Sequence, residues 1–340
     1  PSDRVAAVRA VVITKHGPPE VLQVQERPAP ARPLGDQVLI DVKAAGVNFA
    51  DTMARIGLYP DAPKPPCVVG YEVAGTVTAA GPGANGVQEG QRVMAGVRFG
   101  GYAEQVLVKA NDVVPLPDSL TFEQGAAIPV NYATAWAGLV RYGTLQRGER
   151  VLIHAAAGGV GIAATQIAKH EGADIYGTAS PSKHEAIRSF GVDHPIDYRT
   201  SGWERDLPKF DVIMDAIGGP SFRTSYDLLQ PGGRLICFGA SAVTSGEKRS
   251  LLTAASTALR MPRFNLIKQM SASKAVIGLN MLTLWDDAGT LEPWIRSLRA
   301  LIDDGTVQPV VAEAFPFDRA PNAHRMLAER RNVGKVVLTP

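Results

Sequence analysis

Residues 156–161, Ala-Ala-Gly-Gly-Val-Gly, have the spacing of a phosphate-binding turn, with alanine in the first glycine place. They follow an apolar run directly and open a helical pattern, which is the context that separates a dinucleotide site from a ligand-free glycine turn. The first turn of a helix offers unpaired N–H groups and a positive dipole end, which suit a pyrophosphate. Gly158 lets a phosphate approach the backbone, and Gly161 lets helix and strand pack closely. We therefore expect cofactor contacts from Ala157, Gly158, Gly159 and Val160.

The end of the following strand indicates which nicotinamide cofactor the turn would hold. A site for NAD usually carries Asp or Glu about 20 residues after the glycines, to bind the ribose hydroxyls. Residues 177–184, Gly-Thr-Ala-Ser-Pro-Ser-Lys-His, contain no acid. Ser180, Ser182 and Lys183 offer two hydroxyls and a cation, which suit a 2′-phosphate. The sequence predicts NADPH; the alternative is that these residues only form a solvated loop and a helix cap.

Such motifs need a parallel sheet to position them, and the sequence after about residue 130 predicts one. Apolar strands alternate there with helices, including a helix at His184–Phe190, so both faces of the sheet should be covered. The last strand is expected at an edge, where two copies could pair as a homodimer. The predicted strands are Arg150–Ala155, Asp174–Ala179, Asp211–Ala216, Gly233–Phe238 and Ala275–Leu279.

Residues 9–130 instead show short strands separated by Gly and Pro, which predict a barrel-like β domain. One helix, from Asn48 to about Ile56, interrupts them. A helix over 291–304 follows the parallel-sheet region, and residues 307–340 return to β texture, ending in Lys335–Leu338. We infer an α/β fold in which one domain is inserted into another, with the ligand in the cleft between them. The predicted β strands are Ala10–Thr14, Gln37–Val42, Val68–Ala79, Gln91–Ala95 and Glu104–Val108.

Composition excludes several functional classes. Among 340 residues, 35 Lys and Arg balance 33 Asp and Glu, and no basic run of five occurs, so we expect no nucleic-acid partner. Two cysteines, Cys67 and Cys237, cannot form a disulfide framework or a four-cysteine zinc site, which favours a reducing, cytoplasmic location. No targeting segment is expected, and Val151–Ala168 contains too many polar residues and glycines for a membrane span.

Several short motifs are spread over the chain: Asn48-Phe49-Ala50-Asp51, Arg55, Gly57, Tyr59-Pro60, residues 157–161 and residues 332–336. Together they resemble the quinone oxidoreductase signature of the medium-chain dehydrogenase/reductase superfamily. Three further runs, 177–180, 182–186 and 194–198, resemble one branch of it, the vesicle amine transport protein 1 (VAT-1) homologues. The resemblance implies a GroES-like catalytic domain (1–129 and 281–340) around a Rossmann domain (130–280), usually as a dimer. It also implies NADPH-dependent reduction of quinones or α,β-unsaturated carbonyls, small hydrophobic substrates.

The resemblance implies roles for individual residues. Asn48 would lie beside the nicotinamide and Thr134 near its ring. The remaining cofactor contacts would be Ser180, Lys183 and Tyr198 around the 2′-phosphate, Phe238, Gly239 and Ala240 under the ribose, and Asn332 along the cleft. Zinc-dependent relatives carry Cys in place of Asn48 and Gly-His-Glu in place of residues 70–72, here Gly-Tyr-Glu, so we expect no metal.

Hydride addition to a quinone or enone builds negative charge on the carbonyl oxygen, which hydrogen-bond donors must stabilise where no metal does. The candidate donors are the Asn48 amide, the Tyr59 hydroxyl and a ribose hydroxyl of the cofactor, with Tyr59 or water supplying the proton. The alternatives are that Asn48 only caps its helix and that Tyr59 is only a packed loop aromatic.

Residues 245–274 do not fit the Rossmann pattern, because six Lys or Arg against one Glu are interleaved there with apolar side chains. The segment predicts either a helical lid over the cleft or a surface for peripheral contact with anionic membranes. Two other functions therefore stay open: a cofactor-binding protein at a membrane surface with little catalysis, and an enoyl-thioester reductase.

Overall fold

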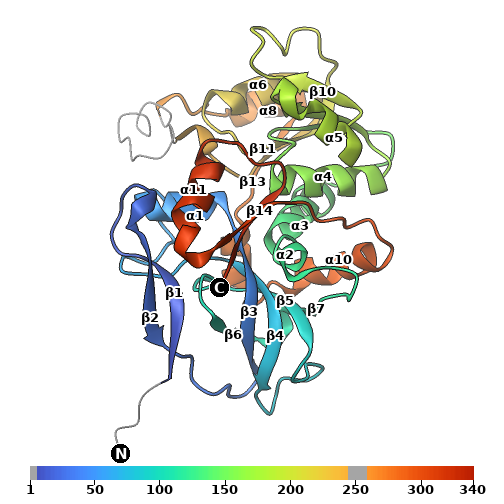
Figure 1. Ribbon diagram of the computed structural model, residues 1–340. Coiled ribbons are helices and arrows are strands. Elements are labelled where there is room, and N and C mark those ends of the chain that lie inside the picture. The colour runs from blue at the N-terminus through green and yellow to red at the C-terminus, as the bar shows by residue number, and fades with distance from the viewer. Residues whose placement is uncertain (1–5, 244–258) are drawn as a thin grey trace, which may run out of the picture.

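The computed structural model describes residues 6–243 and 259–340, which form a β-rich lobe and a parallel-sheet lobe (Figure 1). The parallel sheet has the strand order β10-β9-β8-β11-β12-β13, and every pairing in it is parallel. Helices α4 (Gly159–His170), α5 (His184–Phe190) and α6 (Pro220–Leu228) connect its strands. The strands are β8 (Arg150–Ile153), β9 (Asp174–Ala179), β10 (His194–Asp197), β11 (Phe210–Asp215), β12 (Leu229–Cys237) and β13 (Ala275–Gly278). Among the described strands β13 lies at an edge of this sheet, as predicted for the last strand.

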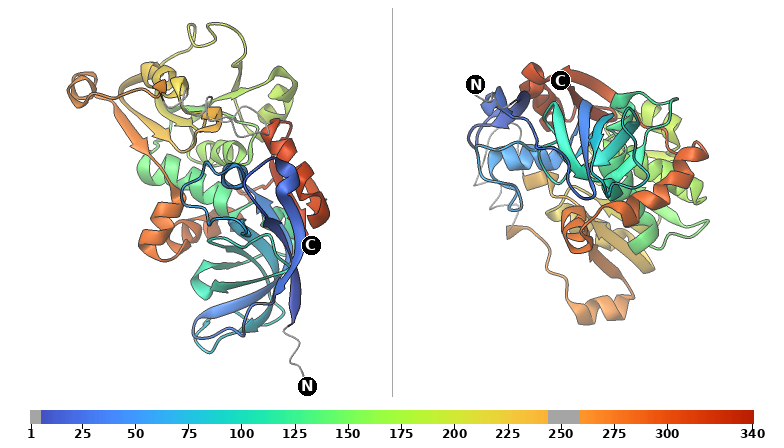
Figure 2. Two further views of the ribbon diagram at one scale, coloured as in Figure 1. Left: turned by 90° about the vertical axis from the view of Figure 1, so that its left-hand side faces the viewer. Right: turned by 90° about the horizontal axis from the view of Figure 1, so that it is seen from below.

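The β-rich lobe is built from both ends of the chain, which confirms the predicted insertion. Its larger sheet has the order β14-β15-β3-β4-β5-β7, with β6 also on β3, and β1 pairs with β2 separately. The C-terminal strand β15 lies antiparallel to β3, next to the early strands (Figures 1 and 2). The strands are β1 (Ala7–Ile13), β2 (Leu22–Pro28), β3 (Gln37–Val47), β4 (Glu72–Ala80), β5 (Arg92–Gly96), β6 (Gln105–Lys109), β7 (Val113–Pro115), β14 (Val311–Pro316) and β15 (Lys335–Thr339).

Further helices cover the sheets and join the lobes. They are α1 (Phe49–Ile56), α2 (Phe122–Gly125), α3 (Pro129–Trp136), which continues as a π-helical turn (Ala137–Tyr142), α8 (Leu266–Ala272), α9 (Met281–Ala288), α10 (Glu292–Asp303) and α11 (Ala320–Ala328). The β texture predicted for residues 307–340 is wrong over α11. Its buried face consists of Ala320, Ala323 and His324, which are too small or too polar to show helical periodicity in the sequence.

The apolar run that predicted the first strand of the parallel sheet forms the buried strand β8. Val151, Leu152 and Ile153 of β8 are at most 1% exposed, because helices pack on both faces of the parallel sheet. No helix within the described ranges combines the length and the apolar character needed to span a membrane.

Candidate active site

A cavity of about 920 Å³ lies between the two lobes and contains all the residues predicted for the site. Its wall on the β-rich side includes the loop and helix that follow β3. On the other side it is lined by the turns that follow β8, β9 and β12. The predicted residues that line it are Asn48, Tyr59, Thr134, Ala157, Gly158, Gly159, Val160, Ser180, Lys183, Tyr198, Phe238, Gly239, Ala240 and Asn332.

The glycine turn forms an open cradle at the N-terminus of α4. Gly158 is the N-cap of the helix, and no side chain caps it. The N–H groups of Val160 and Gly161 have no hydrogen-bond partner among the described residues, whereas Gly158 and Gly159 lie beside Gly334 in a short parallel bridge. A Cβ at Gly161 would lie 2.4 Å from the carbonyl oxygen of Ala155, so only glycine allows α4 to approach the end of β8. Unpaired N–H groups at a helix N-terminus that faces a cavity fit a pyrophosphate.

The far end of the cavity carries cations and hydroxyls. Ser180, Lys183, Tyr198 and Asn332 lie there, together with Arg330, which the sequence reading missed. The Lys183 Nζ donates to the carbonyl oxygens of Arg330 (2.7 Å) and Asn332 (2.6 Å), and burial lowers its pKa. Through these two hydrogen bonds Lys183 links the C-terminal segment to the inserted domain, at the place where the 2′-phosphate is expected.

The other end of the cavity is organised around Asn48. Asn48 is the N-cap residue of α1, and its side chain also reaches beyond the helix: Nδ2 donates to Glu72 Oε1 (3.0 Å), and Oδ1 accepts from Lys335 Nζ (2.7 Å). Lys335 Nζ also donates to Glu72 Oε1, and the other Glu72 oxygen accepts from the N–H of Val130 (2.7 Å). Asn48 is therefore more than a helix cap, because its side chain also bonds two residues outside α1.

Strand pairing explains why these three residues meet. Asn48 follows β3 directly, Glu72 opens β4 and Lys335 opens β15. Because β4 and β15 both run antiparallel to β3, with Val73 opposite Ala45 and Val336 opposite Val47, the three residues lie at the same end of adjacent strands. Sequence reasoning missed Lys335, although a lysine opening an otherwise apolar strand was a usable signal.

Thr134 and residues 238–240 complete the cavity wall. Thr134 is 7% exposed and donates from Oγ1 to the Val130 carbonyl oxygen on its own helix (2.7 Å). Phe238, directly after β12, donates its N–H to the Asp215 carbonyl oxygen (3.1 Å), which sets the direction of the turn.

Two tyrosines, Tyr59 and Tyr71, line the same cavity as Asn48. Burial raises the pKa of Tyr59 to about 12, so its hydroxyl keeps its proton at neutral pH. Its ring packs edge-on against Tyr71, with the ring centroids 6.4 Å apart. Tyr71 is 5% exposed and also lines the cavity. Tyr71 is thus a second hydroxyl near the site, at the position where zinc-dependent relatives carry histidine.

A buried carboxyl group underlies this end of the cavity. Asp51 is fully buried and accepts hydrogen bonds from the N–H groups of Asn48 (2.8 Å) and Gly70 (3.1 Å) and from the Tyr102 hydroxyl (2.8 Å). Desolvation nevertheless raises its pKa from 3.8 to about 7.

We expect Asp51 to make the protein less stable as the pH rises from 4 to 8. Between the unfolded pKa and the folded pKa of about 7, folding requires uptake of a proton, so the stability present at low pH is lost as pH rises through 7. The expected loss is about 2–4 kcal/mol in the free energy of unfolding. Denaturant unfolding at several pH values should show a flatter profile for Asp51→Asn, and parallel profiles for both proteins would contradict this assignment.

The cavity does not fit zinc. The carboxylate of Glu72 is already bonded to Asn48, Lys335 and Val130, and an ammonium group lies where a cation would bind. No group of three His, Cys, Asp or Glu side chains that could hold a metal occurs in residues 6–243 or 259–340. A zinc site needs three protein ligands, so no step of the chemistry is assigned to a metal.

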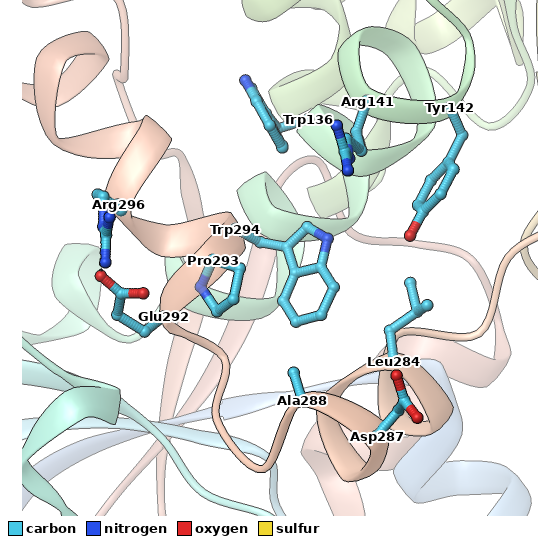
Figure 3. Close-up of a pocket in the computed structure, with 10 residues that line it drawn as sticks. All are labelled: Trp136, Arg141, Tyr142, Leu284, Asp287, Ala288, Glu292, Pro293, Trp294 and Arg296. Carbon is cyan, nitrogen blue, oxygen red and sulfur yellow. Dashed lines mark hydrogen bonds and ion pairs between the residues drawn. The ribbon is translucent and has the colours of Figure 1, made fainter.

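A second hollow, of about 550 Å³, lies between α9, α10 and the π-helical turn (Figure 3). The indole of Trp294 projects into it, and Leu284, Asp287 and Ala288 of α9 form one side. None of the predicted site residues lines it, so the cavity between the lobes is the candidate active site.

The basic segment 245–274 is only partly within the described structure. Residues 244–258 lie outside it, and none of residues 259–274 lines the cavity between the lobes. Leu266, Ile267 and Met270 of α8 are each more than 70% exposed. The described part therefore does not act as a lid in this structure.

Comparison with known proteins places the chain in a family. Residues 35–118 match the alcohol dehydrogenase GroES-like domain, and residues 190–338 match the zinc-binding dehydrogenase family. The human synaptic vesicle membrane protein VAT-1 homolog is 37% identical over 98% of this chain and 86% of its own length. The structure of Escherichia coli quinone oxidoreductase complexed with NADPH matches with a TM-score of 0.83 and 31% identity, over 98% of this chain and 100% of that one.

The CurK enoyl reductase structure matches with a TM-score of 0.83 and 27% identity, over 98% of this chain and 99% of that one. The resemblance seen in the short motifs is therefore confirmed over nearly the whole chain. The chain belongs to the medium-chain dehydrogenase/reductase superfamily of oxidoreductases, among the quinone oxidoreductases and the VAT-1 homologues.

Proposed function

We propose that this protein is an NADPH-dependent, zinc-independent reductase of quinones or α,β-unsaturated carbonyls. The observation that carries the proposal is that one cavity joins an uncapped glycine cradle, an acid-free end with Lys183, and the amide of Asn48. The complex of the E. coli relative with NADPH supports the same cofactor here.

The residues present would hold NADPH along the whole cavity. The N-terminus of α4 would bind the diphosphate, and Ser180, Lys183 and Tyr198 would surround the 2′-phosphate. The nicotinamide would then lie near Thr134 and Asn48, under the turn at residues 238–240. When bound, NADPH supplies the hydride.

The chain's own groups then stabilise the charge that develops on the substrate. An N–H of Asn48 and the Tyr59 hydroxyl donate hydrogen bonds to the carbonyl oxygen, and Tyr59 remains protonated because burial raises its pKa to about 12. Conjugation in a quinone or enone already spreads negative charge, so two donors without a Lewis acid suffice. The apolar walls of the cavity strengthen these hydrogen bonds by excluding water.

The test is NADPH oxidation against a panel of 1,4-quinones and enones, with NADPH binding followed separately by fluorescence. We expect turnover of part of the panel and a loss of about 10²-fold in turnover for Tyr59→Phe, with cofactor affinity unchanged. Tight NADPH binding without turnover of any compound would overturn the reductase proposal. Binding to anionic vesicles that weakens with salt would then favour the membrane-surface alternative.

An enoyl-thioester reductase is the second candidate. The likeness to the CurK enoyl reductase favours it, because the chemistry at the reacting carbon is the same and only the acyl carrier differs. Preferential turnover of a crotonyl-type thioester in the same panel would select this candidate.

We also propose that two copies associate through β13. Within the described part of the chain this strand has a neighbour on only one side, and helix α8 before it exposes Leu266, Ile267 and Met270. Edge-to-edge pairing of two sheets would cover both the free strand edge and nearby apolar surface.

The two unpaired cysteines fit a reducing location such as the cytoplasm.

A further inference from the structure

We propose that Lys335 and Glu72 are positioning residues that hold the amide of Asn48 in one orientation, so that it presents an N–H to the substrate oxygen. The inference rests on the proposed reductase function, because it assigns the direction of a hydrogen bond in that reaction. It concerns two residues that do not themselves touch the substrate.

The contacts form a closed, buried group. Lys335 Nζ donates to Asn48 Oδ1 (2.7 Å), to Asn131 Oδ1 (3.4 Å) and to Glu72 Oε1. Asn48 Nδ2 donates to the same Glu72 oxygen (3.0 Å). The side chains of Lys335 and Glu72 are 3% and 0% exposed. All three donors of the ammonium group therefore point at acceptors, and none is left for the substrate.

The chemistry of the two partners decides which way the amide faces. An ammonium group can only donate, and a carboxylate can only accept. The Asn48 oxygen must therefore face Lys335, and its nitrogen must face Glu72. The opposite orientation would place N–H against ammonium and C=O against carboxylate, which would lose two charge-assisted hydrogen bonds.

The backbone holds Glu72 firmly in this place. Its second oxygen accepts from the N–H of Val130 (2.7 Å). Gly46 leaves room for the carboxylate, since a Cβ there would lie 2.6 Å from Glu72 Oε1. Once one Nδ2 hydrogen is bonded to Glu72, the other has no partner among the described residues, and Asn48 lines the cavity. That hydrogen is the one presented to the carbonyl oxygen.

A purely structural role for the ion pair predicts a different outcome, so the variants must separate the two. Lys335→Met alone would leave the Glu72 carboxylate in the interior without its ammonium partner. The loss of stability would then be difficult to separate from an effect on the orientation of the amide. The double variant Lys335→Met/Glu72→Gln removes both charges and frees the amide to turn. Arg234→Met is the control, because Arg234 pairs with Glu149 at 14% and 19% exposure and does not line the cavity.

Single-turnover hydride transfer is the first readout. We expect the double variant to bind NADPH within about threefold of wild type but to transfer hydride about 10- to 100-fold more slowly. Adding Asn48→Ala should cause no further loss, because the amide is the group through which the pair acts. Arg234→Met should lose stability but keep the rate. A wild-type rate in the double variant, or an additive loss on Asn48→Ala, would overturn the inference.

A readout independent of activity keeps this test separate from the reductase proposal. In protein labelled with ¹⁵N-asparagine, the Asn48 side chain should give two separate, slowly exchanging NH₂ signals, assigned by their absence in Asn48→Ala. In Lys335→Met/Glu72→Gln these signals should broaden or exchange faster. Unchanged signals would refute the positioning role, whereas absence of wild-type turnover would refute only the proposed function.

Discussion

Replacing Gly161 by alanine is expected to abolish NADPH binding and to destabilise the inserted domain. The new Cβ would lie 2.4 Å from the Ala155 carbonyl oxygen and 2.7 Å from the Ala156 Cα, both backbone atoms that cannot turn aside. Ala155 is already at a φ of +53°, so the turn has little freedom to relax. Overpacking of this kind costs about 1–3 kcal/mol, occasionally more, and here it also moves the first turn of α4 away from the diphosphate.

Gly158→Ala is the matched variant for this experiment. A Cβ there would have one neighbour, the Ala155 oxygen at 3.3 Å, and the residue has ordinary extended dihedrals. It should fold normally and bind NADPH more weakly, because the methyl group faces the cavity. Thermal unfolding and fluorescence titration of both variants check the pair. A Gly161→Ala protein with wild-type melting temperature and affinity would contradict the role assigned to the turn.

The glycine turn also shows why one part of the site could be read from the sequence. Its residues are consecutive, and the strand before them and the helix after them carry their own periodicity. Strand β9 and helix α5 therefore have the bounds that their apolar patterns predict, Asp174–Ala179 and His184–Phe190. A phosphate cradle is a local structure, and local patterns define it.

The end of the cavity around Asn48 is different, because it depends on long-range pairing. Lys335 meets Glu72 across 263 residues, and only the register of β15 and β4 on β3 brings them together. In the sequence Glu72 looks like an isolated remnant of a metal ligand set, and Tyr71 like a simple replacement for histidine. The sequence pattern did not predict helix α3 for another reason. Most of its residues are buried, so the sequence shows no alternation of polar and apolar residues with the period of a helix.

The second large effect is expected for Lys183→Glu, which should reduce the preference of the protein for NADPH over NADH. Removing the lysine loses a charge-assisted hydrogen bond to the 2′-phosphate, worth about 1.5–3 kcal/mol. Placing a carboxylate beside a dianion adds a repulsion of several kcal/mol. The ratio of NADPH to NADH affinity should therefore fall by about 10³- to 10⁴-fold, with NADH affinity nearly unchanged. Titrations with both nucleotides at low salt measure this ratio directly.

Lys183→Ala separates recognition from tethering, since Lys183 also donates to the carbonyl oxygens of Arg330 and Asn332. If Lys183 reads the 2′-phosphate, the alanine variant should lose about 10- to 100-fold in NADPH affinity and almost none for NADH. If it serves only to hold the C-terminal segment against the inserted domain, both nucleotides should bind more weakly by the same factor. Equal losses would therefore assign discrimination of the phosphate to Arg330 and the hydroxyls of Ser180 and Tyr198, which line the same end of the cavity.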